Sequence, residues 1–235
     1  MANSYFQFKQ FTVHQEKCAM KVGTDGVLLG AWADLSRSTR LLDIGTGSGL
    51  IALMAAQRSE SARIDAIEID MEAYQQAQYN IQLSPWKERI HLFQGDIQNF
   101  TPEYLYDTII CNPPFFISSL QTPQKNRTIA RHCTTLSHED LFHSVQRLLS
   151  PMGVFYLILP VPEAEQFIHF VQTQNWFVNR ITQVHPTLQK PPKRYLLQLS
   201  RQETPGQTDT LILEIERHQY HESFKKLVKD FYLHL

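Results

Sequence analysis

The chain has 235 residues, 43% of them hydrophobic, which is enough for one substantial core, so we expect a single domain spanning residues 1–235. It carries 22 Lys and Arg against 23 Asp and Glu, and this formal net charge of -1 excludes the strongly basic composition of many dedicated nucleic-acid binders. Its three cysteines are too few and too widely spaced for a disulfide framework or a paired metal motif, and no apolar run is long enough to cross a bilayer, so we expect a soluble cytoplasmic protein without a metal site.

From residue 40 onward, short apolar runs alternate with amphipathic stretches. The runs have the length and β-branched content of strands, and the stretches between them have helical periodicity. The alternation predicts a doubly wound α/β sheet. The predicted strands are Arg40 to Ile44, Arg63 to Glu68, Ile90 to Gln94, Tyr106 to Cys111 and Val154 to Leu159, and the predicted helices are Leu50 to Gln57, Met71 to Leu83, His138 to Leu149 and Glu163 to Thr173.

The pattern changes after Thr173. Two strand-like runs, Trp176 to Val184 and Arg194 to Ser200, flank a turn that contains Lys190 and Lys193, which is typical of a hairpin. The stretch Arg201 to Asp209 then reads as an exposed loop. A last strand over Thr210 to Ile215 and a polar helix from about Ser223 complete the predicted elements.

A glycine-rich turn follows the first predicted strand, in the stretch from Asp43 to Gly49. Glycines here let a ligand approach the backbone at the carboxyl end of a parallel strand. A dinucleotide fingerprint needs its third glycine at position 50, where Leu50 stands, so NAD is disfavoured. The alternative interpretation is an ordinary turn between a strand and a helix that binds no ligand.

Acidic residues stand at the ends of three successive predicted strands. S-adenosylmethionine (SAM) has an ammonium group, a ribose and an adenine but no pyrophosphate, so its site needs a close-packed glycine turn and hydrogen-bond acceptors. Asp43 can meet the ammonium group, Glu68 both ribose hydroxyls and Asp96 the adenine amino group. The sequence therefore favours SAM as the cofactor, with Gly45 and Gly47 lining the turn.

The tetrapeptide Asn112-Pro113-Pro114-Phe115 follows the fourth predicted strand and is the most specific feature of the chain. An exocyclic amine has its lone pair delocalised into the ring, and acceptors on its two N–H bonds draw that pair out. The Asn112 side chain and the Pro113 carbonyl can be these acceptors, the prolines stiffen the turn, and Phe115 can stack on a base. The alternative is a rigid proline turn without chemistry.

With these motifs in view, the chain resembles the bacterial tRNA1(Val) adenine-N6 methyltransferase family of Asn-Pro-Pro-Phe enzymes along nearly its whole length. The resemblance rests on Phe8 to Phe11 with Met20 to Gly30, on Asp43 to Gly49 with Ala66 to Asp70, and on Asn112 to Phe116 with Arg127 to His132. It implies a Rossmann-like class I SAM-dependent methyltransferase with a seven-stranded, mostly parallel sheet and an antiparallel C-terminal hairpin.

The resemblance also implies a donor, an acceptor and further site residues. The donor is SAM, and the acceptor is the N6 of adenine 37, next to the anticodon of tRNA1(Val). Residues 1–30 form a segment that covers the cofactor, with contacts from Lys21 and Thr24, and Ile97 lies beside the cofactor next to Asp96. A monomer is favoured.

Basic residues on either side of the tetrapeptide are candidates for contacts to tRNA phosphates, although each one alone reads equally well as a solvated charge. They are Lys125, Arg127, Arg131, Lys190, Lys193 and Arg194. Three other functions stay open at this point: methylation of guanine N2 in ribosomal RNA, methylation of a protein glutamine, and a non-catalytic SAM-binding module that interacts with RNA.

Overall fold

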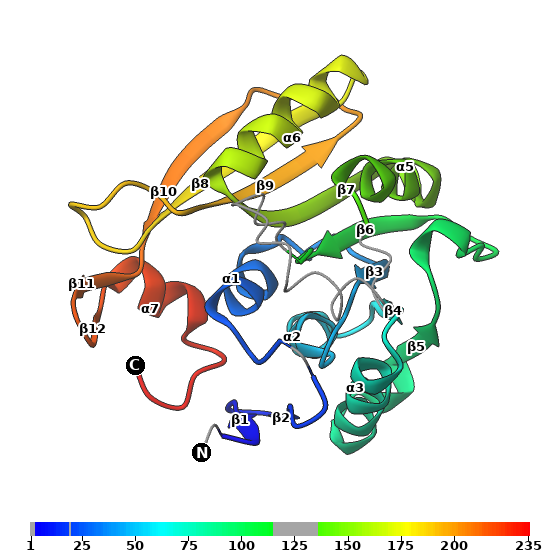
Figure 1. The fold of residues 1–235 in the computed structure, drawn as a ribbon, viewed down its shortest axis with the longest axis horizontal. Coiled ribbons are helices and arrows are strands. Elements are labelled where there is room, and N and C mark those ends of the chain that lie inside the picture. Colours follow the sequence, from blue (N-terminus) through cyan, green and yellow to red (C-terminus); the bar gives the residue numbers. More distant parts are fainter. Residues whose placement is uncertain (1–2, 19, 115–135) are drawn as a thin grey trace, which may run out of the picture.

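The computed structural model describes residues 3–18, 20–114 and 136–235 (Figure 1). Its central feature, within this part of the chain, is an eight-stranded sheet with the order β10-β8-β9-β7-β6-β3-β4-β5. The strands are β3 (Arg40–Ile44), β4 (Arg63–Glu68), β5 (Ile90–Gln94), β6 (Tyr106–Cys111), β7 (Leu149–Pro160), β8 (Phe177–His185), β9 (Arg194–Ser200) and β10 (Gln207–Ile212).

All neighbouring pairs in this sheet are parallel except those of β9, which is antiparallel to β7 and to β8. The predicted α/β class with a mostly parallel sheet and an antiparallel C-terminal hairpin is therefore confirmed. The strand order reverses between β3 and β6, because the chain passes from β3 outward to β4 and β5 before it returns to β6. Ligands of open α/β sheets bind at such a switch point, outside the carboxyl ends of the strands.

The predicted number of seven strands is wrong, because β10 adds an eighth strand parallel to β8. β10 begins at Gln207, inside the predicted loop, and the predicted run to Ile215 is divided between β10 and β11 (Glu214–Glu216). The side chain of Asp209 adds to this pairing, since its carboxylate accepts hydrogen bonds from Arg180 and Thr182 of β8. Polar residues fill the first part of β10, from Gln207 to Thr210, so that part lacks the apolar alternation by which strands are predicted.

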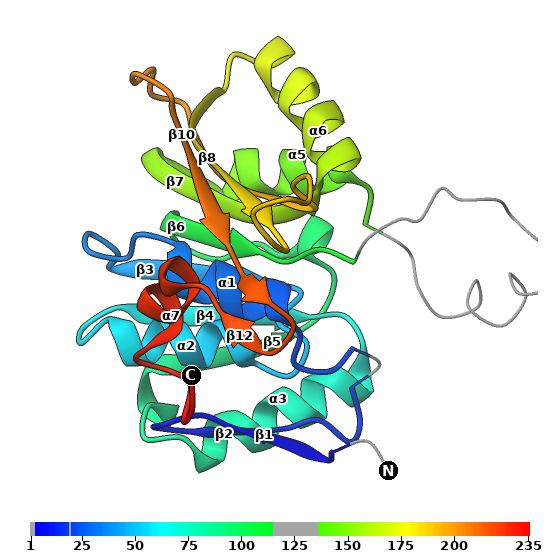
Figure 2. The same cartoon turned by 90° about the vertical axis from the view of Figure 1, so that its left-hand side faces the viewer.

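Helices cover both faces of the sheet (Figure 2). One face carries α1 (Thr24–Trp32), α2 (Leu50–Arg58), α3 (Met71–Leu83) and α7 (Glu222–Val228), and the other carries α5 (His138–Leu148) and α6 (Val161–Thr173). Successive strand residues serve opposite faces: Leu41 packs into the first cluster and Leu42 into the second. Because both faces are buried in the middle of the sheet, the central strands β3, β6 and β7 are largely apolar. Helices α2, α3, α5 and α6 have bounds within two residues of those predicted.

Three N-terminal elements were not predicted from the sequence. The strands β1 (Tyr5–Gln7) and β2 (Thr12–His14) form an antiparallel pair, and Phe8 bridges to Tyr232, so the two ends of the chain meet. Helix α1 is buried nearly all round, and a helix of this kind has no amphipathic period from which it can be predicted. The short elements are η1 (Lys87–Arg89), η2 (Ile97–Asn99) and β12 (Gln219–Tyr220), which pairs with β11.

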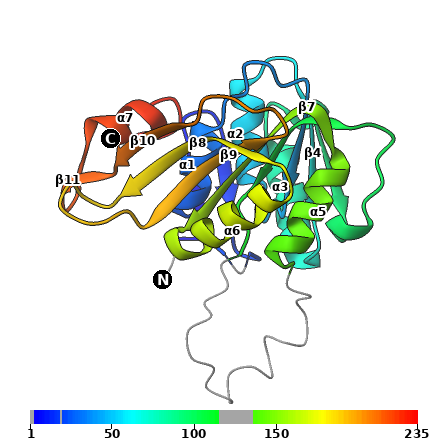
Figure 3. The same ribbon diagram turned by 90° about the horizontal axis from the view of Figure 1, so that it is seen from above.

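Viewed from above, α7 lies with β10 and β11 at one side of the molecule, while α3 and β4 lie toward the other (Figure 3). Among the described residues, no helix combines the length and the hydropathy that a membrane span needs.

Candidate active site

The glycine turn links β3 to α2 and leaves a bare backbone surface. Gly45, Gly47 and Gly49 have φ angles of +67°, +58° and +83°, in the left-handed region that costs other residues about 1–2 kcal/mol. A Cβ built on Gly45 or on Gly47 would meet no atom within 4 Å. The turn therefore offers open space directly against its main chain.

Asp43 stabilises this turn through hydrogen bonds from its buried side chain. Its side chain is fully buried, and Oδ2 accepts hydrogen bonds from Thr46 Oγ1 at 2.6 Å and from the Ala52 amide at 3.1 Å. Oδ1 is buried without a hydrogen-bond partner among the described residues. Burial raises the pKa of this carboxyl to about 7, so a cation placed nearby would favour its ionised form.

Glu68 connects the end of β4 to the same turn. Its Oε2 accepts a hydrogen bond from the Gly47 amide at 2.8 Å, and its Oε1 accepts one from the Asp70 amide at 2.9 Å. A carboxylate has about four acceptor sites, so acceptor capacity remains on both oxygens. Glu68 thus fixes the turn and keeps acceptors at the ligand end of the sheet.

The third acidic residue, Asp96, lies beyond β5, the next strand of the sheet. It caps η2, where Oδ1 accepts a hydrogen bond from the Gln98 amide at 2.9 Å, and it is half-buried. The neighbouring Ile97 is buried. The amide of Gly95 donates to the Glu68 carbonyl at 2.9 Å, which ties the two strand ends together.

Asn112 stands across the switch point from the glycine turn. Cys111 pairs with Ile44 in the parallel register of β6 and β3, so Asn112 and Gly45 leave adjacent strands at the same level. The Asn112 Oδ1 atom is buried and has no hydrogen-bond partner among the described residues. Because this acceptor lies at the switch point, it is available to a hydrogen-bond donor of a ligand bound at the carboxyl ends of the strands.

The residues around Asn112 provide rigidity. Pro113 is buried and Pro114 is exposed. A Cβ on Gly26, in the first turn of α1, would lie 3.7 Å from the Asn112 Nδ2 atom, so α1 packs closely against this side chain. Burial raises the pKa of the Cys111 thiol well above its usual value, which disfavours a thiolate nucleophile at this position.

Comparisons with known proteins agree with this geometry. The family model of the methyltransferase small domain matches residues 21–158. A protein of Parabacteroides distasonis named tRNA1(Val) (adenine(37)-N6)-methyltransferase is 50% identical over 99% of each chain. A protein of Pectobacterium carotovorum with the same name is 48% identical over 97% of this chain and 93% of its own.

The chain belongs to the tRNA1(Val) (adenine-N6)-methyltransferase family. The resemblance noted in the sequence is confirmed. Among solved structures, a predicted O-methyltransferase from Agrobacterium tumefaciens aligns with a TM-score of 0.69 over 88% of this chain and 96% of that one, at 20% identity. The glycopeptide N-methyltransferase MtfA complexed with S-adenosyl-L-homocysteine aligns with a TM-score of 0.56 over 77% and 90%, at 14% identity. These two likenesses support the methyltransferase fold.

The structure brings together only some of the predicted site residues of this family member. Asp43, Gly45, Gly47, Glu68 and Asn112 meet at the switch point, and Asp96 with Ile97 lies one strand beyond Glu68. Lys21 and Thr24 are exposed near the start of α1, where the Lys21 Nζ donates to the Asn3 carbonyl at 3.3 Å. Phe115, Lys125, Arg127 and Arg131 lie outside the described residues.

Of the three predicted phosphate-binding residues after β8, two are exposed and the third forms an ion pair within the protein. Lys190 and Lys193 are exposed in the turn before β9. Arg194 forms an ion pair with Asp25 of α1 at 2.9 Å. Sequence reasoning missed this pair because 169 positions separate its members. It links the C-terminal hairpin to the helix that packs on Asn112.

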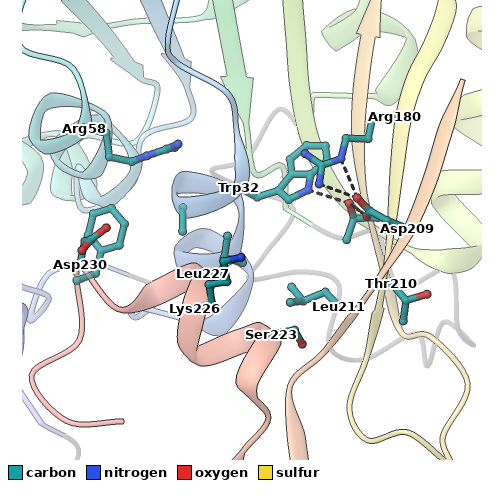
Figure 4. Close-up of a pocket in the computed structure, with 13 residues that line it drawn as sticks. Trp32, Arg58, Arg180, Asp209, Thr210, Leu211, Ser223, Lys226, Leu227 and Asp230 are labelled. Atoms are coloured by element: carbon teal, nitrogen blue, oxygen red, sulfur yellow. Dashed lines mark hydrogen bonds and ion pairs between the residues drawn. The ribbon is translucent and has the colours of Figure 1, made fainter. Parts of the chain in front are cut away.

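A cavity of about 440 Å³ lies apart from these residues, between α1, α7, β8 and β10 (Figure 4). Its polar groups are largely paired within the protein: Arg180 lies over the Trp32 ring at 4.9 Å and forms an ion pair with Asp209. No predicted site residue lines it. The described residues also contain no group of three or more His, Cys, Asp and Glu that could hold a metal ion. The candidate site therefore rests on the chemistry at the switch point and not on cavity size.

Proposed function

We propose that this chain transfers the methyl group of SAM to the N6 atom of an adenine in tRNA, and that this adenine is residue 37 of tRNA1(Val). The observation that carries the proposal is the buried, unpartnered Asn112 Oδ1 atom, one strand away from an open glycine turn. The names of the relatives from Parabacteroides distasonis and Pectobacterium carotovorum support the choice of acceptor.

The residues of the glycine turn fit SAM. A Cβ at Gly45 or Gly47 would fill the space that a close-packed cofactor needs, and Asp43 keeps an unpartnered carboxylate oxygen for an ammonium group. Glu68 would hold the ribose hydroxyls and Asp96 the adenine amino group. When bound, SAM supplies an electrophilic methyl group on a sulfonium.

Asn112 and Pro113 would activate and orient the acceptor. The Asn112 Oδ1 atom and the Pro113 carbonyl accept hydrogen bonds from the two N–H bonds of the exocyclic amine. These bonds draw the nitrogen lone pair out of conjugation and aim it across the switch point toward the cofactor. The nitrogen becomes cationic as it gains the methyl group, and its proton then leaves, so no general base is required beforehand.

Exposed lysines and an ion pair would place the RNA around this centre. We infer that Lys190 and Lys193 contact tRNA phosphates, because they are exposed and follow the carboxyl end of β8, at the same edge of the sheet as Asn112. Arg194 would act through Asp25, by holding the β9 end of the hairpin against α1.

The test is transfer of labelled methyl from SAM to total tRNA, total ribosomal RNA and a protein extract from cells that lack this enzyme, followed by nucleoside mass spectrometry. N6-methyladenosine in a valine tRNA is the expected product. Label in ribosomal RNA or protein would refute the acceptor and keep the chemistry. No label in any fraction would refute methyl transfer and favour a non-catalytic SAM-binding module.

A further inference from the structure

One buried asparagine joins two parts of the candidate cofactor site. Asn80 of α3 is 1% exposed, and its Oδ1 accepts a hydrogen bond from the His14 amide at 2.9 Å. Its Nδ2 donates to the carbonyls of His14 and Ser48, both at 2.8 Å. His14 ends β2 and Ser48 lies in the glycine turn, so a single carboxamide connects the N-terminal segment to that turn.

Two glutamines extend this connection to Lys17 and Val22. Gln76 lies one helical turn before Asn80 on the same face of α3, and its Oε1 accepts a hydrogen bond from the Lys17 amide at 3.0 Å. The Gln15 Oε1 accepts one from the Val22 amide at 2.8 Å. Both glutamine side chains are buried. Buried amides fix one arrangement because any other would leave polar atoms unpaired.

Close packing adds a second constraint at the same place. A Cβ built on Gly49 would lie 3.6 Å from the Cα and Cβ atoms of Ala77, so the last residue of the glycine turn rests directly on α3. Ala77 stands between Gln76 and Asn80 in the sequence. The helix thus holds the turn by contact and the N-terminal segment by hydrogen bonds.

We propose that Asn80 is a positioning residue for the cofactor, which holds residues 14–18 and 20–22 and the glycine turn as one preorganised unit. The identity of the cofactor rests on the proposed function. We call the hydrogen bonds of Asn80, Gln76 and Gln15 to this segment and turn the clamp. Without the clamp, binding of the cofactor would have to order the N-terminal segment and the glycine turn, and the cost of that ordering would lower the affinity for the cofactor. Asn112 lies on another strand end, so the loss should fall on cofactor affinity and leave turnover at saturating SAM nearly unchanged.

The test compares two asparagine-to-aspartate variants. Asn80→Asp keeps the acceptor and loses both donated hydrogen bonds. Asn179→Asp is the matched control, since Asn179 is also buried and its Nδ2 donates to Gln202 and Thr204 in the C-terminal half. Titration calorimetry of each purified variant gives the dissociation constant of SAM, amide hydrogen exchange reports on the clamp, and methyl transfer gives kcat.

In Asn80→Asp the SAM dissociation constant should rise about tenfold or more, the scale of one or two buried hydrogen bonds, with kcat within about threefold of wild type. The amides of His14 and Gly47 should exchange faster together. Asn179→Asp should change none of these. An unchanged dissociation constant in Asn80→Asp, or an equal rise in the control, would overturn the proposal.

A second pair of variants keeps the proposal testable if Asn80→Asp does not fold. Gln76→Leu removes the acceptor for the Lys17 amide and should weaken SAM binding about threefold to tenfold, whereas Gln76→Glu keeps an acceptor and should restore affinity. Equal affinities in the two variants would contradict the clamp. Wild-type protein that binds no SAM would refute the proposed function instead, and the clamp would then be judged by hydrogen exchange alone.

Discussion

The ends of β3 and β6 lie side by side, yet their polar groups differ in how far they are hydrogen-bonded within the protein. At the end of β3, Thr46 and the Ala52 amide donate to Asp43 Oδ2 and the Gly47 amide donates to Glu68, although Asp43 Oδ1 has no partner among the described residues. At the end of β6, the Asn112 carbonyl is buried with no partner among the described residues. The first arrangement is typical of a rigid turn whose main chain contacts a ligand. The second is typical of a side chain that accepts a hydrogen bond from the substrate during the reaction.

Replacing Asn112 should give the largest effect on turnover. Asn112→Ala removes an acceptor that acts on the reacting nitrogen, so we expect kcat to fall about 10²-fold to 10³-fold, the scale of one preorganised catalytic hydrogen bond. The SAM dissociation constant should stay within about twofold of the wild-type value, because the glycine turn and Glu68 are unchanged. Steady-state methyl transfer at saturating SAM and tRNA gives kcat, and calorimetry gives the SAM dissociation constant. A near-normal kcat would show that Asn112 does not activate the acceptor nitrogen.

Replacing Glu68 should weaken SAM binding and leave turnover nearly unchanged, the reverse of the effect expected for Asn112. Glu68→Ala removes acceptors for the ribose hydroxyls and leaves the Gly47 and Asp70 amides unpaired, so SAM affinity should fall about 30-fold to 100-fold. Turnover at saturating SAM should change little. Glu68→Gln keeps one acceptor oxygen and should lie between wild type and Glu68→Ala. An unchanged SAM dissociation constant in the alanine variant would count against the ribose assignment.

The glycine turn can be tested through its backbone. Gly47→Ala forces a side chain into the left-handed region, at φ +58°, and places a methyl group on the open surface. Unfolding free energy should fall by about 1–2 kcal/mol and SAM affinity by about 20-fold. Gly206→Ala is the control, since a Cβ there meets its nearest atom at an ordinary 3.5 Å. Equal affinities for the two variants would show that the turn does not touch the cofactor.

A dependence on pH should single out Asp43. Its pKa of about 7 must fall when a cation binds beside it, so the complex holds fewer protons than the free protein and affinity rises with pH. Between pH 6 and pH 8 the SAM dissociation constant should fall by up to about tenfold. Asp43→Asn should bind more weakly and lose this dependence. A flat profile in the wild type would place the ammonium group elsewhere.

The sequence predicts the β3 to β6 region well and the N-terminal region poorly, for physical reasons. β3, β4 and β6 are buried along most of their length, so their apolar runs and the motifs that follow them mark the elements and the site directly. In contrast, α1 is buried nearly all round, so it has no amphipathic period from which a helix can be predicted.

Contacts between distant parts of the chain escaped sequence reasoning. The Asp25–Arg194 ion pair joins positions that no local pattern relates. Asn80 gave one weak signal, a polar residue on the helix face that also carries Ala73 and Ala77. A polar side chain at such a buried position must find partners, but the sequence does not say which ones.

The most direct measurement is single-turnover methylation of a tRNA1(Val) transcript and of the same transcript with guanine in place of adenine 37, by wild type and by Asn112→Ala, with nucleoside mass spectrometry. We predict N6-methyladenosine only in the adenine transcript, formed about 10²-fold to 10³-fold more slowly by Asn112→Ala than by wild type. Equal N6-methyladenosine in both transcripts would contradict the proposed acceptor, and unimpaired methylation by Asn112→Ala would contradict the role of the unpartnered carbonyl.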